Sequence, residues 1–243
     1  SEEEELEKIA REVLRELKEI LEELDDIYRR VTDRLRKLLE RLKKEYEEVK
    51  KELEDLKRRK ADVKDLLRVL RRLVKVDMEV LDKLLEIVRE LSEADKDILR
   101  RILEVVEKAV KALKDVLDRA GEPERDVKKK KDDIDKKLEE LRRELEDYKR
   151  RNDERLKRLE EKIEKYKRDS RKILEDIERE VKRDGPSEEL VDRLIKLLDE
   201  NLKRSEEVIR EIIELARKNA EDSRRVIKKI IELLREMLKD ARR

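Results

Sequence analysis

The sequence contains no cysteine, histidine, tryptophan or phenylalanine, and only two glycines and two prolines among its 243 residues. Without cysteine the chain can form neither disulfides nor thiolate metal ligands. Without histidine it lacks a common zinc ligand and the side chain that titrates near neutral pH. Few glycines and prolines mean few places where a helix is forced to end. These absences exclude disulfide-stabilised folds, ordinary zinc sites and imidazole acid–base chemistry.

Long hydrophobic runs and a surplus of one charge are also missing. No apolar run approaches the roughly 18 residues that cross a bilayer, and Ser1 followed by four glutamates is unlike a signal peptide. We expect a soluble protein with no membrane partner and no targeting signal, in keeping with cytoplasmic recombinant expression. The 71 basic and 70 acidic residues nearly cancel, whereas nucleic-acid binding needs a basic surplus on one face. We therefore expect no nucleic-acid partner.

Helical periodicity dominates what is present. Charged residues make up 58% of the chain, and Leu, Ile and Val recur between them throughout, unlike in a disordered chain. From Val127 to Val181 the apolar phase repeats about every 3.6 residues, the period of a straight helix and not the ~3.5 of a left-handed coiled coil. The sequence predicts long, nearly straight helices.

Two short segments carry explicit turn residues. Gly121 can end one helix in the left-handed conformation, and Pro123 can begin the next. Gly185 and Pro186 form a similar break, after which Ser187 is placed to cap a helix that opens at Glu188. These breaks alone would leave a continuous helix of about 120 residues, roughly 180 Å long.

A repeat of 18 residues relates polar side chains along each predicted helix. Eighteen residues are five helical turns, so each copy returns to the same helix face about 27 Å further on. The related pairs are Tyr28 and Tyr46, Asp95 and Asp77, Tyr148 and Tyr166, Asn152 and Ser170, Asn219 and Asn201, and Ser223 and Ser205.

The repeat also locates a third turn. Residues of one buried layer must lie equally far from the loop that joins their helices. Tyr28 with Asp95, and Tyr46 with Asp77, are centred near Ala61, just before Asp62, which can act as an N-cap. Helix caps near Asp77 or Ser92, or one uninterrupted helix over 2–120 that needs a partner chain, are the alternatives, but none gives helices of equal length.

We therefore predict an all-α fold, an up-down-up-down antiparallel four-helix bundle of long helices of about 58 residues each. The helices are expected over about 2–59, 62–120, 123–183 and 187–242, and residues 1–243 are expected to form a single domain about 85 to 90 Å long.

Fourteen side chains are predicted to form two buried polar layers, a structural polar network that fixes helix register. Buried polar atoms are tolerated only when they satisfy one another, and clustering in layers permits this. The first polar layer is Tyr28, Thr32, Ser92, Asp95, Tyr148, Asn152, Asn219 and Ser223. The second polar layer is Tyr46, Asp77, Tyr166, Ser170, Asn201 and Ser205.

Catalysis and metal binding are disfavoured at these layers. A buried Asp beside a Tyr could in principle transfer protons. The chain offers no accompanying nucleophile, glycine-rich loop or cleft signal, and without histidine it lacks the Glu-x-x-His motif of di-metal bundles. We predict no catalytic, cofactor-binding or metal-binding residues, no cofactor and no enzymatic activity.

Taken together, the Glu/Lys/Arg/Asp surface, the Leu/Ile/Val interior, the missing residue types and the repeated Tyr/Asn/Ser/Asp layers resemble de novo designed helical bundles with buried hydrogen-bond networks. The resemblance covers the whole chain and is one of style, with a glycine-free first turn as its departure. It implies a hyperstable scaffold with no natural substrate. We expect a monomer that requires no partner. The alternative is a helical interaction module that pairs with a designed partner chain or with itself.

Overall fold

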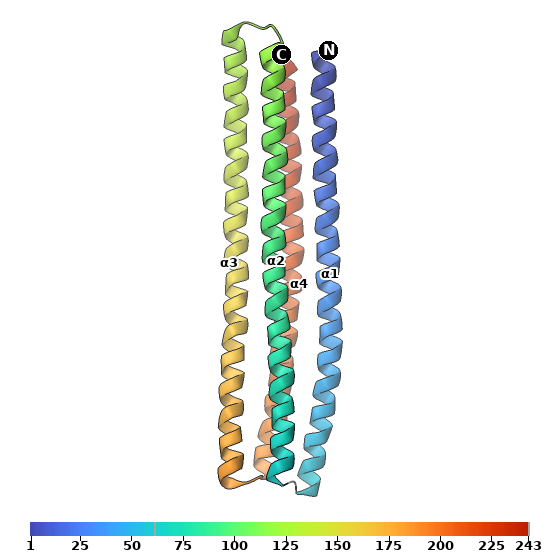
Figure 1. Ribbon diagram of the computed structural model, residues 1–243, viewed down its shortest axis with the longest axis vertical. Helices are drawn as coiled ribbons and strands as arrows, with labels where there is room; N and C mark the ends of the chain where they lie inside the picture. The colour runs from blue at the N-terminus through green and yellow to red at the C-terminus, as the bar shows by residue number, and fades with distance from the viewer. Residues whose placement is uncertain (61, 243) are drawn as a thin grey trace. The chain divides into compact units, whose positions relative to one another are not determined.

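The computed structural model describes residues 1–60 and 62–242, and the part of the chain that it describes is all-α (Figure 1). Its elements are α1 (Glu2–Arg59), α2 (Val63–Arg119), α3 (Glu124–Asp184) and α4 (Glu188–Arg242). They are 58, 57, 61 and 55 residues long. The predicted four-helix bundle is confirmed, and the predicted helix boundaries differ from the observed ones by one residue at most.

Charges at the helix ends favour these boundaries. The first turn of α1 contains Glu2 to Glu5, and its last turn contains Lys57 to Arg59. The first turn of α4 likewise begins with Glu188 and Glu189. Acidic side chains near the N-terminus and basic ones near the C-terminus oppose the partial charges of the helix dipole. Each end contributes a few tenths of a kcal/mol to about 1 kcal/mol.

The two predicted glycine turns are present. Gly121 and Gly185 have φ angles of 69° and 79°, in the left-handed region where glycine pays no Cβ penalty. After the second, the Ser187 Oγ accepts a hydrogen bond from the Leu190 N–H at 3.2 Å and caps α4. Both breaks therefore end one helix and start the next by the chemistry that the sequence predicted.

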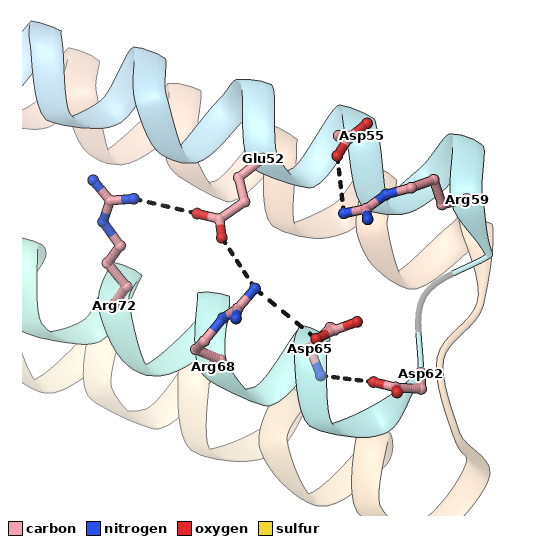
Figure 2. A network of polar contacts seen from close by, with 7 residues as sticks. All are labelled: Glu52, Asp55, Arg59, Asp62, Asp65, Arg68 and Arg72. Atoms are coloured by element: carbon pink, nitrogen blue, oxygen red, sulfur yellow. Dashed lines mark hydrogen bonds and ion pairs between the residues drawn. The ribbon is translucent and has the colours of Figure 1, made fainter.

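The first turn uses a lysine where the other two use glycine. Lys60 follows the end of α1 with a φ of 52°, which costs a residue with a Cβ roughly 1–2 kcal/mol. Asp62 then caps α2, because its Oδ1 accepts a hydrogen bond from the Asp65 N–H at 2.9 Å (Figure 2). The predicted turn is confirmed by the helix ends on either side, whereas Ala61 itself lies outside the described residues.

Ion pairs surround this turn. Figure 2 shows the Glu52 carboxylate between two arginines of α2, with Arg68 at 3.4 Å and Arg72 at 3.2 Å. Asp55 pairs with Arg59 at 2.9 Å within α1. Exposed pairs of this kind contribute at most about 1 kcal/mol each. These ion pairs help to align α1 with α2, but they contribute little of the free energy that packs the two helices together.

The chain divides into two compact units, and every helix contributes to both. Unit 1 comprises 1–29, 92–154 and 216–243, and unit 2 comprises 30–91 and 155–215. Asp95 and its neighbours fall in unit 1, and Asp77 and its neighbours fall in unit 2.

Within each unit, ion pairs connect the helices in the same cyclic order, α1 to α2, α2 to α3, α3 to α4 and α4 to α1. In unit 1 examples are Arg119–Glu5, Arg142–Glu107, Lys137–Asp240 and Arg224–Asp25. In unit 2 examples are Arg72–Glu48, Arg89–Glu160, Lys162–Glu211 and Lys57–Asp192. Successive pairs between α1 and α4 run in opposite directions, as in Lys57–Asp192, Lys50–Asp199 and Lys43–Glu206. Neighbouring helices are therefore antiparallel.

Aliphatic side chains fill the interior of each unit. Leu17, Ile102, Leu141 and Ile227 are fully buried in unit 1. Leu42, Leu73, Ile163 and Ile212 are fully buried in unit 2. Burying one such side chain stabilises a fold by about 1.5–3 kcal/mol. Across the described residues, no helix contains a stretch that is both long and apolar enough to cross a membrane.

Candidate functional site

Asp95 is the centre of the polar groups in unit 1. Its side chain is 5% exposed. Its Oδ2 accepts hydrogen bonds from the Asn152 Nδ2 of α3 at 2.6 Å and the Asn219 Nδ2 of α4 at 2.8 Å. One carboxylate oxygen on α2 therefore links three helices.

The environment of Asp95 also shifts its titration. Burial raises the pKa of Asp95 to about 6, although the Asn152 and Asn219 amides favour the ionised form and partly oppose this shift. The nearby Asp153 carboxylate raises the pKa further. The desolvation of a carboxylate outweighs two amide hydrogen bonds here.

Tyr148 connects α3 to α4 in the same unit. Its hydroxyl donates to the Asn219 carbonyl oxygen at 3.1 Å and lies 3.0 Å from the Ser223 Oγ, where either oxygen can donate. A backbone carbonyl has two lone pairs, so the tyrosine can use the one that the helix leaves free. Asn219 is thus held through its side chain by Asp95 and through its backbone by Tyr148.

The three other residues predicted for the first polar layer lie differently. Tyr28 and Ser92 are only half-buried in unit 1, and no hydrogen bond found among the described residues joins either of them to Asp95. Thr32 is 6% exposed and falls in unit 2, where its Oγ1 has no hydrogen-bond partner. Hydrogen bonds connect Asp95, Asn152, Asn219, Tyr148 and Ser223.

Asp77 and Tyr46 form the corresponding pair in unit 2. The Tyr46 hydroxyl of α1 donates to the Asp77 Oδ1 of α2 at 2.9 Å, and both side chains are at most 2% exposed. Burial raises the pKa of Asp77, and the Tyr46 and Ser170 hydroxyls and the Arg204 guanidinium partly oppose this shift. Burial, followed by the charge of Asp77, also raises the pKa of Tyr46 above its ordinary value.

The other residues predicted for the second polar layer separate into two groups. Ser170, Asn201 and Ser205 are each 2% exposed. Tyr166 is half-buried, and its ring lies 5.2 Å from the Arg204 Cζ and 5.8 Å from the Lys162 Nζ. These are cation–π distances. Tyr166 therefore faces cationic side chains, whereas its repeat partner Tyr148 hydrogen-bonds in the interior.

The sequence did not predict a role for Arg204. Its guanidinium acts on both Asp77 and Tyr166, and its Nη1 is enclosed without a hydrogen-bond partner. Arg204 lies three residues after Asn201, so the two share a helix face. This spacing was the available signal, but one basic residue out of 71 does not stand out.

Each unit thus presents one buried carboxylate among hydroxyl and amide groups. Such a group can accept hydrogen bonds or exchange a proton. In residues 1–60 and 62–242, no three acidic side chains converge in the way that a metal site requires. The hydrogen bonds join residues of different helices, so their most direct consequence is mechanical.

Comparison with other proteins finds no family and a likeness in fold class to a designed helical bundle. No family model matches the chain, and no curated protein matches it. A solved structure described as a computationally designed three-helix bundle is similar at 21% identity, with 98% of this chain and 95% of that chain covered and a TM-score of 0.34. This likeness assigns no function to the chain.

Proposed function

We propose that this protein is a designed structural scaffold without catalytic activity, in which the two polar layers specify helix register and pairing. The observation that carries the proposal is the bonding of Asp95, whose single Oδ2 accepts from Asn152 on α3 and Asn219 on α4. The interaction satisfies a buried charge only in one axial alignment of three helices. A scaffold must hold its helices in one axial alignment. Aliphatic contacts alone distinguish poorly between alignments.

The physical reason is the difference between aliphatic and polar contacts. A helix that slides by one turn exchanges one Leu or Ile contact for another at little cost. The same slide moves the Asn219 amide by about 5.4 Å and leaves Asp95 without that donor. Losing one hydrogen bond to a buried charged group costs about 1.5–3 kcal/mol. The polar contacts therefore penalise the wrong alignment far more than the aliphatic contacts do.

Pulsed electron spin resonance tests this function. Because the chain has no cysteine, spin labels can be placed uniquely at K96C on α2 and K218C on α4, both exposed positions of unit 1. We expect one narrow distance distribution in the parent and a broadened or shifted one after N152L/N219L. The core substitution I227L is the matched control and should leave the distribution narrow. An unchanged narrow distribution in N152L/N219L would refute the role in register.

The monomeric state belongs to the same proposal. Small-angle scattering on an absolute scale should give the mass of one chain at every concentration tested. A mass that doubles with concentration would instead favour the alternative function, a helical interaction module that pairs with itself or with a partner chain. Neither outcome depends on the role of the polar layers.

We propose also that residues 1–243 form a single, hyperstable domain. All four helices contribute residues to unit 1 and to unit 2, so unfolding one unit must interrupt every helix within its length. Such interruption breaks helical cooperativity. Calorimetry should show one transition above about 90 °C. Two separate transitions would divide the chain into two domains.

A further inference from the structure

Four enclosed polar atoms at and beside the second polar layer of unit 2 have no hydrogen-bond partner among the described residues. They are the Asp77 Oδ2, the Asn201 Oδ1 and Nδ2, and the Arg204 Nη1. The Thr32 Oγ1 of the same unit and the Asn152 Oδ1 and Asn219 Oδ1 of unit 1 also have no partner there, and both of the unit 1 atoms are acceptors. Asp77 and Asn201 are each 2% exposed. Buried donors and acceptors almost always find a partner, either in the protein or in ordered water. A cluster of unpaired atoms in one layer therefore indicates a partner of another kind.

Electrostatics and the sequence repeat place these atoms in one region of unit 2. The Arg204 guanidinium is close enough to Asp77 to act on its charge, and Asn201 precedes Arg204 on the same face of α4. Helices α2 and α4 run in the same direction, because each is antiparallel to its neighbours. The 18-residue repeat therefore places Asn201 opposite Asp77 as it places Asn219 opposite Asp95, and that second pair is 2.8 Å apart. Asn201 and Asp77, by contrast, make no direct bond.

The difference between the layers lies on α3. In unit 1, Asn152 reaches the Asp95 Oδ2 with its amide. In unit 2 the same repeat position is Ser170, whose side chain is shorter by an amide group and cannot fill the same space. The Asp77 Oδ2 therefore lacks the amide donor that the Asp95 Oδ2 has.

We propose that the second polar layer is a buried water-binding site, formed by Asp77, Asn201 and Arg204 beside Ser170. The unpaired atoms select water over an ion because they are of both kinds. The Asn201 Nδ2 and Arg204 Nη1 are donors, and the Asp77 Oδ2 and Asn201 Oδ1 are acceptors. A cation would satisfy only the acceptors and an anion only the donors. Water donates and accepts, and a buried water typically makes about three hydrogen bonds.

A high-resolution crystal structure of the unmodified protein is the first test. We expect a water molecule within about 3 Å of both the Asp77 Oδ2 and the Asn201 amide, and none between Asp95 and Asn219. A direct Asn201–Asp77 bond, or a dry layer, would overturn the proposal. Crystals soaked in rubidium chloride test the other occupant, because an anomalous peak at this position would identify a cation site.

A reciprocal pair of variants separates the site from general packing. S170N copies the α3 residue of unit 1 and should expel the water by donating directly to the Asp77 Oδ2. N152S copies the α3 residue of unit 2 and should create a water site beside Asp95. Water retained unchanged in S170N would show that the length of residue 170 does not form the site.

Solution NMR gives a readout that does not depend on the variants folding. In the isotope-labelled parent protein, the Asn201 side-chain amide should show NOE and ROE cross-peaks to water. The signs of these cross-peaks should be those of a long-lived, bound water molecule. The Asn219 amide serves as the internal reference, because it donates directly to Asp95. Cross-peaks of equal strength from both amides would contradict a water site specific to unit 2.

Discussion

The two units contain the same repeated residue types, yet they satisfy their buried aspartates differently. Asp95 in unit 1 accepts two amide hydrogen bonds on one oxygen, from α3 and α4. Asp77 in unit 2 accepts a tyrosine hydroxyl from α1 on its Oδ1, and no group of the described residues is placed to hydrogen-bond its Oδ2. A sequence repeat therefore copies which residues face the interior without copying the bonds they form.

The tyrosines show the same difference. In unit 1 the buried tyrosine is Tyr148 of α3, whereas Tyr28 of α1 is half-buried. In unit 2 the buried tyrosine is Tyr46 of α1, whereas Tyr166 of α3 is half-buried. The buried tyrosine thus lies on α3 in unit 1 and on α1 in unit 2. Helical phase places all four rings close to the interior, and close packing leaves room for only one buried ring in each unit.

The largest expected effect comes from removing the donors of Asp95. N152L/N219L should lower the free energy of unfolding at pH 7 by about 3–5 kcal/mol, because a buried carboxylate loses both amide partners. N201L should cost less, about 1–2 kcal/mol, since its amide bonds no other group of the described residues and loses only its contacts with the buried water. Urea unfolding of the three proteins measures both. Equal losses would remove the distinction between the units.

A second difference concerns pH. The folded-state pKa of Asp95, about 6, lies above its ordinary value of 3.8, so folding favours the protonated form. The contribution of Asp95 to stability is complete below about pH 4 and falls by about 3 kcal/mol as the pH rises through 6.

Urea unfolding of the parent and D95N at pH 4 and pH 7 checks this sign. The parent should be more stable relative to D95N at pH 4 than at pH 7. Comparing the two proteins cancels the titration of the surface carboxylates, which D95N retains. A constant difference between the proteins would show that the pKa of Asp95 is not raised by folding.

Removing single tyrosine hydroxyls tests whether only the buried tyrosine of each unit stabilises the fold through its hydroxyl. Y46F should lower the free energy of unfolding by about 1–3 kcal/mol, because it strips the Asp77 carboxylate of its hydroxyl donor. Y148F should cost about 1 kcal/mol. Y28F and Y166F are the matched controls on the same two helices and should change stability by less than about 0.5 kcal/mol. Thermal unfolding of the four variants measures these losses. Equal losses in Y28F and Y166F would contradict the difference between buried and half-buried tyrosines.

Modest effects are expected at the turns. K60G should raise the free energy of unfolding by up to about 1 kcal/mol, because glycine relieves the left-handed strain while losing more entropy on folding. G121A should lower the free energy of unfolding by about 1–2 kcal/mol, because alanine would have to adopt the left-handed φ of 69° that Gly121 has. Chemical denaturation checks both. A destabilising K60G would mean that the Lys60 side chain contributes more than its backbone strain costs.

Much of the fold could be predicted because its signals are local. Gly121, Gly185 and Ser187 carry turn and cap chemistry in their own residue types. The first turn has no glycine or proline, and the spacing of Asp77 and Asp95 from Tyr46 and Tyr28 located it, with Asp62 as a possible cap. The left-handed conformation of Lys60 was not predicted, because lysine has no preference for it and adopts it only where two packed helices leave no other path.

The sequence by itself determined the number of helices, their bounds and which faces turn inward, since helical period and turn chemistry act over a few residues. The tertiary structure alone decided which hydroxyl or amide reaches which carboxylate, that Arg204 lies beside Asp77, and which tyrosine of each pair is buried. Those outcomes depend on distances of a few tenths of an ångström between side chains on different helices. Hydrogen bonding and close packing are sensitive to such distances, and a one-dimensional repeat does not encode them.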